Sequence, residues 1–459
     1  MTLFRTNIRH LENITMIKYK KHIAEISVIA APMVIGNLGH VLTGATDVFV
    51  AAKHSVDTLA AIAIANSIFF TIFILGLGLL TGISIILSNK RGAKHPTKKY
   101  FLSGVILSQI LAFFTWIAVL IVTYFMPKFG FEAHLVKSIQ DYMYITSFSL
   151  YGMFLYQGIK EFLQAHEIVN FPNLLLLISV VLNLALNFIF VFGWGIIPAL
   201  GIVGLSIATL ISRTILGIAM VIYTWKIIKT QQAKQVYDTN YMKNVLKLGF
   251  PIGVGLLFEF LSFNIITIAV GREAGVYAAT QNILITIIDI AFMIPLSISS
   301  AIAIKVGYFN GAKNLTEIRD FGVTGTLMSL TFMMFVAILY IAMPETFIGF
   351  FTSDKGIIDI ALPIVHLFAL SEIADGVQIS LGGMLKGLKM TKQVTTIVIS
   401  CYWLLGIPIG FYLAYAQKMY LKGFWIGLTI ALFCIAVIEI LVITRKYYQI
   451  KRLGFEETA

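Results

Sequence analysis

The stretch FLSGVILSQILAFFTWIAVLIVTYFM, residues 101–126, decides the fold. It runs for 26 residues without a charged side chain, and about 20 apolar residues in a helix are enough to cross the hydrocarbon layer of a membrane. In lipid every backbone N–H and C=O group must find its partner within the protein, which leaves helices or a closed barrel. The run is continuous rather than alternating, so it predicts a membrane-spanning helix.

The rest of the chain repeats this pattern. Of the 459 residues, 58% are hydrophobic and only 12% are charged, about half the charged fraction that is typical of a soluble domain. We therefore predict an all-α integral membrane protein with twelve transmembrane helices. The apolar runs place these helices near residues 23–52, 57–88, 101–126, 137–165, 172–193, 199–226, 242–272, 276–305, 321–346, 357–389, 392–416 and 422–447.

The net charge of +12 is concentrated in alternate loops. Such a distribution marks the loops that stay in the cytoplasm, so a multi-pass protein of the cell (inner) membrane with both termini cytoplasmic is expected. Because the charge is explained by topology, no nucleic-acid partner is predicted, and the expected surroundings are membrane lipid around a monomer. The basic clusters lie at residues 5–21, 90–99, 226–247, 305–319, 386–392 and 445–452.

The two halves of the chain look like copies of each other. One offset aligns Pro32 with Pro251 and also aligns Gly92-Ala93-Lys94 with Gly311-Ala312-Lys313. Two pseudo-symmetric six-helix lobes related by an axis along the membrane normal are predicted, with a cavity where they meet. The expected organisation is a cytoplasmic N-terminal segment (1–22), an N-lobe (23–226), a cytoplasmic linker (227–241), a C-lobe (242–447) and a cytoplasmic tail (448–459).

No feature of the sequence predicts enzymatic chemistry. Cys401 and Cys434 both lie in apolar runs, so a disulfide framework or a cysteine-based metal site is not expected. The chain has no Walker motif, no HExxH and no G-x-S-x-G, and the glycines of GLGLLTG in the second helix are explained by close helix packing. We expect no cofactor, no enzymatic activity and, for any uphill transport, an ion gradient of Na⁺ or H⁺ as the source of energy.

One candidate ion site lies in the first half of the chain. Asp47 stands near the end of the first helix, Asn183 and Asn187 lie four residues apart on one face of the fifth, and Thr209 lies on the sixth. A carboxylate, two amides and a hydroxyl suit a hard cation or a carboxylate that takes a proton. Two alternatives stay open, an Asp47 at the outer interface and an asparagine pair that only joins helices.

The second half offers an acidic set. A charge inside the membrane costs a few kcal/mol, so each carboxylate there is a functional candidate. Glu259 follows Pro251 by about two turns, and Glu372 and Asp375 are three residues apart on one side of a helix. Asp289 could join them or could pair with a lysine. Together these residues predict an acidic cavity that attracts cations.

Other polar groups in the apolar runs are interpreted structurally. Glu439 is close enough to Arg445 to reach the interface by snorkelling, and Arg213, read as the one cation well inside a span, is taken as a structural partner of a carboxylate or of carbonyl groups. His40 and His366 lack the spacing of metal ligands and are interpreted as core histidines. No metal site beyond the Na⁺ candidates is predicted.

Several segments, taken in order, resemble the multidrug and toxic compound extrusion (MATE) family of ion-coupled exporters. The resemblance covers nearly the whole chain. Its segments are Pro32 to Asp47, LNLALNFIFVFG (182–193), GIVGLSIAT (201–209), FEF (258–260), FMIPLSISSAIAIKVGYFNGA (292–312), DGVQ (375–378) and MLKG (384–387).

The resemblance implies a role for each matching residue. It implies that Asp47, with Asn183, Asn187 and Thr209, forms the cation site of the N-lobe and that Pro32 lets the first helix bend. Glu259 and Asp375 resemble the NorM branch, often sodium-coupled, in which two such carboxylates serve ion coupling and the binding of cationic drugs. The chain departs from the family at LQAHEIVNFP (163–172), at Arg213 and at Asp289.

The predicted function is a secondary antiporter that exports bulky, often cationic organic compounds in exchange for Na⁺ or H⁺. The 35 Phe and 19 Tyr supply aromatic surface for such cations. The alternative is a lipid-linked oligosaccharide flippase of the same superfamily, which would need several basic residues in its cavity. A receptor or scaffold would leave the buried carboxylates unexplained. The sequence does not identify the physiological substrate, the coupling ion and its stoichiometry, or the resting conformation.

Overall fold

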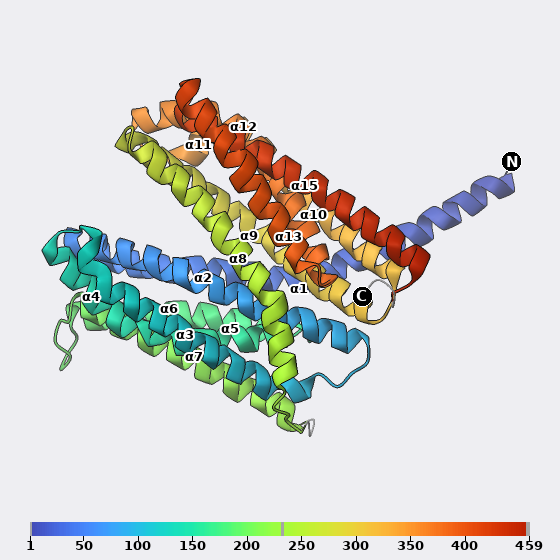
Figure 1. The fold of residues 1–459 in the computed structure, drawn as a ribbon, viewed down its shortest axis with the longest axis horizontal. Coiled ribbons are helices and arrows are strands. Elements are labelled where there is room, and N and C mark those ends of the chain that lie inside the picture. The colour runs from blue at the N-terminus through green and yellow to red at the C-terminus, as the bar shows by residue number, and fades with distance from the viewer. Residues whose placement is uncertain (1, 231–233, 456–459) are drawn as a thin grey trace. The chain divides into compact units, whose positions relative to one another are not determined.

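The computed structural model describes residues 2–230 and 234–455. Residue 1 of the predicted N-terminal segment, residues 231–233 of the predicted linker and residues 456–459 of the predicted tail lie outside the described residues. Figure 1 follows the helices along the chain. Those of the first half are α1 (Thr2–His54), α2 (Val56–Gly92), α3 (Phe101–Phe125), α4 (Ala133–Ser147), α5 (Ser149–Gln164), α6 (Asn170–Phe192) and α7 (Ile202–Thr230).

The second half is built in the same way. Its elements are α8 (Thr239–Gly271), α9 (Gly275–Gly311), α10 (Leu315–Ala342), the short α11 (Pro344–Gly349), α12 (Lys355–Gly387), α13 (Thr391–Ile399), α14 (Ile407–Phe411) and α15 (Tyr420–Leu453). The π-helical turn η3 (Ser400–Gly406) joins α13 to α14, and a second π-helical turn, η4 (Tyr412–Ala416), extends α14 at its end. Pro408 near the start of α14 has no N–H to donate, and the wider π turns accommodate that gap.

Eleven helices in the described part of the chain are long and apolar enough to cross a membrane. The twelfth, predicted at 137–165, is divided into α4 and α5 at Phe148, so neither piece reaches the required length alone. At this point the Ser147 hydroxyl donates to the carbonyl of Tyr144 at 2.7 Å, and such a bond competes with the helical ladder. With six spans in each half, the predicted all-α membrane fold is confirmed.

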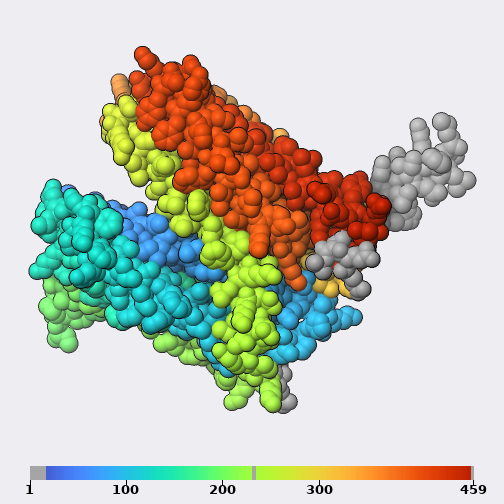
Figure 2. Space-filling view, viewed as in Figure 1, coloured from blue at the N-terminus to red at the C-terminus, as the bar shows by residue number. Residues whose placement is uncertain are grey.

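Exposed apolar side chains agree with a lipid environment. They are frequent on α15, which is part of the red surface in Figure 2. Water would penalise such a surface, whereas lipid tails do not. Large side chains exposed along this helix are Ile430, Phe433, Val437, Ile438, Ile440 and Leu441.

The predicted repeat is visible in the backbone of each half. Lys94 after α2 and Lys313 after α9 both have a left-handed φ, of 60° and 55°. In each case the next residue closes the helix with the same bond, from His95 N to Lys90 O and from Asn314 N to Phe309 O, both at 2.9 Å. The two halves therefore end equivalent helices with the same motif.

The chain divides into two compact units. Unit 1 comprises Met1–Val34, Gly92–Lys94 and Phe258–Ala459, and unit 2 comprises Ile35–Arg91 and His95–Leu257. The division falls inside α1 and α8, a few residues after Pro32 and Pro251. The helix α1 also begins at Thr2 rather than near residue 23, because its polar first part contains no helix breaker. The lobe boundaries at 23–226 and 242–447 stay a prediction.

Glycines allow α2 and α8 to pack closely within unit 2. A Cβ atom on Gly78 would overlap the backbone of Gly253, and one on Gly82 would overlap the carbonyl of Val245. Gly249 in turn lies against the backbone of Leu79. This contact confirms that the glycines of GLGLLTG serve helix packing rather than a ligand-binding loop.

Replacing Gly253 by Val is expected to prevent the close approach of α2 and α8. Overpacking costs about 1–3 kcal/mol in ordinary cores, and here the clash is with backbone that has no rotamer to change. We expect a large loss of folded protein, measured as the monodisperse fraction in size-exclusion chromatography after detergent extraction. Gly44→Val is the matched control, because a Cβ there meets open space. Equal folded yields for the two variants would contradict this packing.

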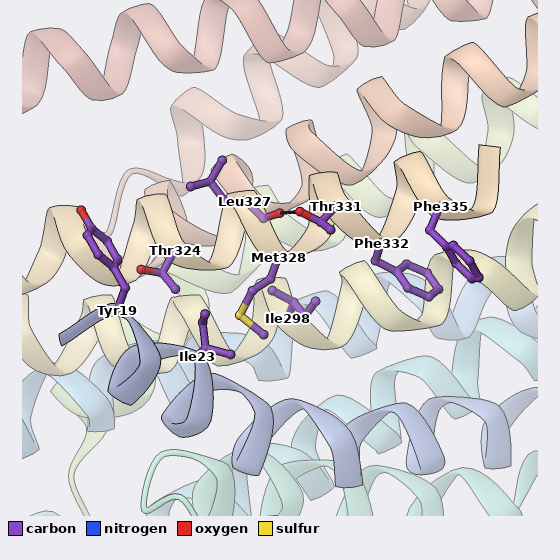
Figure 3. Close-up of a pocket in the computed structure, with 9 residues that line it drawn as sticks. All are labelled: Tyr19, Ile23, Ile298, Thr324, Leu327, Met328, Thr331, Phe332 and Phe335. Atoms are coloured by element: carbon purple, nitrogen blue, oxygen red, sulfur yellow. Dashed lines mark hydrogen bonds between the residues drawn. The ribbon is translucent and has the colours of Figure 1, made fainter. Parts of the chain in front are cut away.

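The first part of α1 packs against α9 and α10 within unit 1. An apolar groove of about 720 Å³ lies along this packing, with Tyr19 and Ile23 from α1, Ile298 from α9, and Phe332 and Phe335 from α10 in its wall (Figure 3). The groove contains no carboxylate. It is therefore not one of the predicted cation sites.

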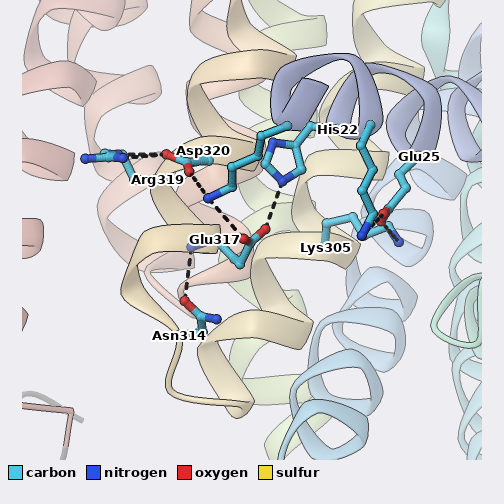
Figure 4. A network of polar contacts seen from close by, with 9 residues as sticks. His22, Glu25, Lys305, Asn314, Glu317, Arg319 and Asp320 are labelled. Atoms are coloured by element: carbon cyan, nitrogen blue, oxygen red, sulfur yellow. Dashed lines mark hydrogen bonds and ion pairs between the residues drawn. The ribbon is translucent and has the colours of Figure 1, made fainter. Parts of the chain in front are cut away.

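Ion pairs fix this part of α1 at its polar end. Lys18 contacts Asp320 at 2.6 Å and Glu317 at 3.2 Å, and His22 Nε2 lies 2.9 Å from Glu317 Oε2 (Figure 4). A second pair joins Lys305 of α9 to Glu25 at 2.8 Å. Within unit 1 these contacts hold α1 by its charged side chains in addition to its apolar face.

Replacing Asp320 by Asn is expected to weaken this attachment. Asp320 is buried and serves both Lys18 and Arg319, so the loss should lie between the ~1 kcal/mol of an exposed pair and the ~3–5 kcal/mol of a fully buried one. The measurement is the thermal unfolding midpoint in detergent, with exposed Asp359→Asn on α12 as the control. A midpoint equal to that of the control would show that the ion pairs add nothing to stability.

Candidate ion and substrate sites

The predicted N-lobe residues meet inside unit 2. Asp47 of α1 accepts a hydrogen bond from Asn187 Nδ2 at 2.8 Å and another from Thr209 Oγ1 at 3.3 Å. Asn183 Oδ1 accepts from Asn187 Nδ2 at 3.2 Å, one helical turn along α6. All four side chains are buried, with Asp47 only 2% exposed. Asp47 is therefore enclosed by protein, and the four residues form one cluster.

Neighbouring hydroxyl groups extend this cluster. Thr46 Oγ1 donates to Asn183 Oδ1 at 2.9 Å, and Asn183 Nδ2 lies 3.4 Å from Ser212 Oγ. Asn187 Oδ1 is buried without a hydrogen-bond partner. The amide that donates to Asp47 therefore also carries an oxygen that is not engaged and could serve as a ligand of a cation. Sequence reasoning missed Thr46 and Ser212, although Thr46 directly precedes Asp47.

Arg213 lies close to this cluster. Its Nη1 donates to Ser149 Oγ at 3.1 Å, and its guanidinium group lies 5.4 Å from the centre of the Phe69 ring. It also interacts electrostatically with Asp47 and Tyr142. The arginine is thus held by a hydroxyl and an aromatic face, and its charge acts on Asp47.

A second charged pair in unit 2 was not predicted. Lys160 and Glu161 of α5 are only 4% and 5% exposed, so Arg213 is not alone as a buried cation in the predicted spans. Ser84 Oγ donates to Glu161 at 2.5 Å, and Gln157 Nε2 donates at 3.0 Å. The sequence did not reveal their burial, because both charges lie near the end of the predicted helix 137–165, where side chains usually reach water.

The C-lobe candidates lie in unit 1. Glu372 and Asp375 of α12 are buried, and Glu259 of α8 is half-buried. Gln378 Nε2 donates to Asp375 Oδ1 at 2.7 Å, while Glu372 Oε2 has no hydrogen-bond partner. The charge of Asp375 interacts with that of Glu259 and with that of Glu372. The structure thus brings three predicted carboxylates into one electrostatic neighbourhood.

Asp289 joins this group from the side of α9. It lines a cavity of about 250 Å³ together with Phe260, Phe263 and Asn264 of α8. Its charge interacts with Glu372 and Asp375, and no lysine lines the cavity. Asp289 was expected either to join the acidic group or to pair with a lysine, and the structure supports the first alternative. A carboxylate beside two phenylalanine rings is a suitable surface for an organic cation.

Two structural interpretations of single residues are wrong. Glu439 is fully buried and faces α12 rather than the interface, because α15 continues as a helix to Leu453. His366 is exposed on α12 and is not a core histidine, whereas His40 is half-buried with its ring 6.1 Å from that of Tyr156. Among the described residues no group of three or more His, Cys, Asp or Glu side chains is arranged to hold a metal ion.

Known proteins match both halves of this chain. The sequence profile of the MatE family matches residues 32–189 and 251–412. A probable multidrug resistance protein NorM from Photorhabdus laumondii is 26% identical, covering 94% of this chain and 98% of its own length. One from Mesorhizobium japonicum is 28% identical, with coverages of 93% and 94%.

Solved structures show the same fold. The eukaryotic MATE transporter AtDTX14 superposes with a TM-score of 0.85 at 20% identity, covering 96% of this chain and 100% of that one. A MOP superfamily transporter from Pyrococcus furiosus superposes with a TM-score of 0.84 at 17% identity, with coverages of 93% and 96%. Because the MatE profile matches more than half of the chain, the chain belongs to the MatE family, as a twelve-helix, multi-pass membrane protein that is similar to NorM over nearly its whole length.

Proposed function

We propose that this protein exports bulky organic cations in exchange for Na⁺ entering through the site around Asp47. The observation that carries the proposal is the burial of Asp47 among Asn183, Asn187 and Thr209. The charge of Arg213 acts on Asp47, but its Nη1 donates to Ser149 rather than to the carboxylate. A buried carboxylate is costly unless a proton or a cation neutralises it. Its position in a membrane helix makes that proton or cation the natural coupling ion. The relatives named as multidrug resistance proteins NorM support export as the activity.

The acidic group of unit 1 supports a cationic substrate. Glu259, Glu372, Asp375 and Asp289 bring four carboxylates together, and the neighbouring cavity adds Phe260 and Phe263. An organic cation would satisfy the charge, and its apolar part would contact the aromatic rings. Ion and substrate would then compete by favouring different conformations, each through its differential affinity for the two states. Pro32 inside α1 is proposed to let that helix bend between them.

Basic side chains bear on the flippase alternative. The sequence did not reveal that Lys160 and Lys305 are buried and Lys386 half-buried, so there are more enclosed basic side chains than expected. Each of them, however, interacts electrostatically with a carboxylate, namely Glu161, Glu25 and Glu259. They do not form the cluster of free positive charge that an anionic diphosphate substrate needs. We therefore rank cation export first.

The deciding experiment uses the full chain reconstituted in lipid vesicles and loaded with a fluorescent organic cation. An inward Na⁺ gradient at equal pH on both sides should drive efflux, and a pH gradient in the absence of Na⁺ should drive less. Efflux with a pH gradient alone would replace Na⁺ by H⁺. Transport of an anionic lipid-linked substrate, with no response to organic cations, would support the flippase instead. We also propose an inner-membrane location, cytoplasmic termini and a monomer, which cysteine accessibility and light scattering can test.

A further inference from the structure

Glu439 of α15 is the most completely enclosed carboxylate of unit 1 outside the proposed substrate group. It is 0% exposed, and neither of its oxygens accepts a hydrogen bond. Its Oε1 would lie 3.4 Å from a Cβ atom on Gly382, so the side chain points onto α12 at a position where a glycine leaves room for it. A bare carboxylate in such a place must be compensated by a cation or by a proton.

Lys386 is the cation whose charge acts on Glu439. It lies one turn beyond Gly382 on α12, and its charge interacts with Glu439 of α15 and with Glu259 of α8. The ionisable groups that act on Glu439 from the surrounding elements are Lys386, Glu259 and Cys401 of η3. The charge of one ammonium group thus acts on two carboxylates on different helices, and it can fully compensate only one of them.

We propose that Lys386 alternates between Glu259 and Glu439, and that Glu439 takes up a proton whenever Lys386 pairs with Glu259. The proposal rests on the proposed cation export and adds a proton-binding residue to it. When a substrate cation neutralises Glu259, the ammonium group turns to Glu439, which releases its proton to water and stays ionised. When the substrate leaves, the ammonium group returns to Glu259, and one Oε of Glu439 binds a proton from water. No uncompensated charge remains in either state.

Glu439→Gln tests the proposal, because the amide keeps the shape of the side chain but cannot take up a proton. With wild-type folding, efflux of the fluorescent cation should become less dependent on pH, and its half-maximal pH should move by about one unit or more, a tenfold change in proton concentration. Exposed Glu345→Gln on α11 is the matched control. If the wild type and Glu439→Gln have the same pH profile, the proposal is wrong even though export stands. If the wild type shows no gradient-driven efflux, the proposed function fails instead.

A spectroscopic measurement tests the proton without transport. Infrared difference spectra between substrate-free and substrate-bound protein should contain a protonated-carboxyl band that Glu439→Gln removes and Glu345→Gln retains. Persistence of the whole band in Glu439→Gln would overturn the proposal. If Glu439→Gln does not fold, a second comparison is used. It measures the folded yield of Lys386→Met and of the double variant Lys386→Met/Glu439→Gln. The double variant should recover folded protein that Lys386→Met loses, and a double variant no better than Lys386→Met would contradict shared compensation.

Discussion

Asp47→Asn is expected to abolish ion-driven efflux while leaving the protein folded. The asparagine side chain has nearly the same shape, and its single oxygen can still accept the bond from Asn187 Nδ2 that Asp47 accepts at 2.8 Å. It carries no charge, however, so it can neither balance a bound Na⁺ nor exchange a proton. We expect the Na⁺-driven rate to fall to that of vesicles without protein, since the coupling step itself is removed.

The measurement compares this variant with wild type at equal protein density in the vesicles. Asp57→Asn, an exposed carboxylate at the start of α2, is the matched control and should keep the wild-type rate. An unchanged unfolding midpoint for Asp47→Asn would show that the loss is functional. Wild-type efflux from Asp47→Asn would show instead that Asp47 only joins α1 to α6 and α7.

The site around Asp47 could be assembled from the sequence because its members obey simple spacing rules. Asn183 and Asn187 share a face at i and i+4, and a polar face inside an apolar helix has to point at protein. Once Asp47 and Thr209 were assigned to helices of the same half, a shared cluster followed. The orientation of each amide could not be predicted from the spacing of the residues. Whether Asn187 directs its nitrogen or its oxygen toward Asp47 depends on the whole hydrogen-bond network.

The charged pairs that the sequence did not reveal have a different origin. Lys160, Lys386 and Glu439 all lie near the ends of predicted helices, where long side chains commonly reach water. Whether they do so depends on which helix covers them, and that is a tertiary property. Glu439 is enclosed because α12 presents Gly382 to it, a contact that no spacing rule along α15 contains.

The fold itself follows from apolar length and from the repeat. Helix ends that depend on apolar runs were placed within a few residues, as at α3 and α6. Interruptions of the helical hydrogen-bond ladder were not predicted. Examples are the break at Phe148 and the π turns around Pro408. The polar first part of α1 was also missed, because hydropathy marks the membrane-spanning part of a helix and not its full length.

The coupling ion can be identified by removing one amide. Na⁺ needs several oxygen ligands, whereas a proton needs only the carboxylate. The buried, unpartnered Asn187 Oδ1 could provide one of those oxygens after a rotation of its amide, in which case Na⁺ would replace the hydrogen bond that Asn187 now donates to Asp47. Asn187→Ala is therefore expected to raise the Na⁺ concentration for half-maximal efflux by about tenfold or more, since a bond to a charged group contributes about 1.5–3 kcal/mol.

The same variant has a different effect if the ion is a proton. Asp47 would keep its bond from Thr209 and could still take up and release a proton, so efflux under a pH gradient should survive in Asn187→Ala with at most a shifted pH profile. Asn170→Ala, exposed at the start of α6, is the matched control for both measurements. Sodium as the coupling ion requires this rise in the Na⁺ concentration for half-maximal efflux in Asn187→Ala but not in Asn170→Ala. If Na⁺-driven efflux stayed intact in Asn187→Ala, or if a pH gradient alone sufficed for the wild type, the carboxylate would be a proton site and the surrounding amides its hydrogen-bonding cage.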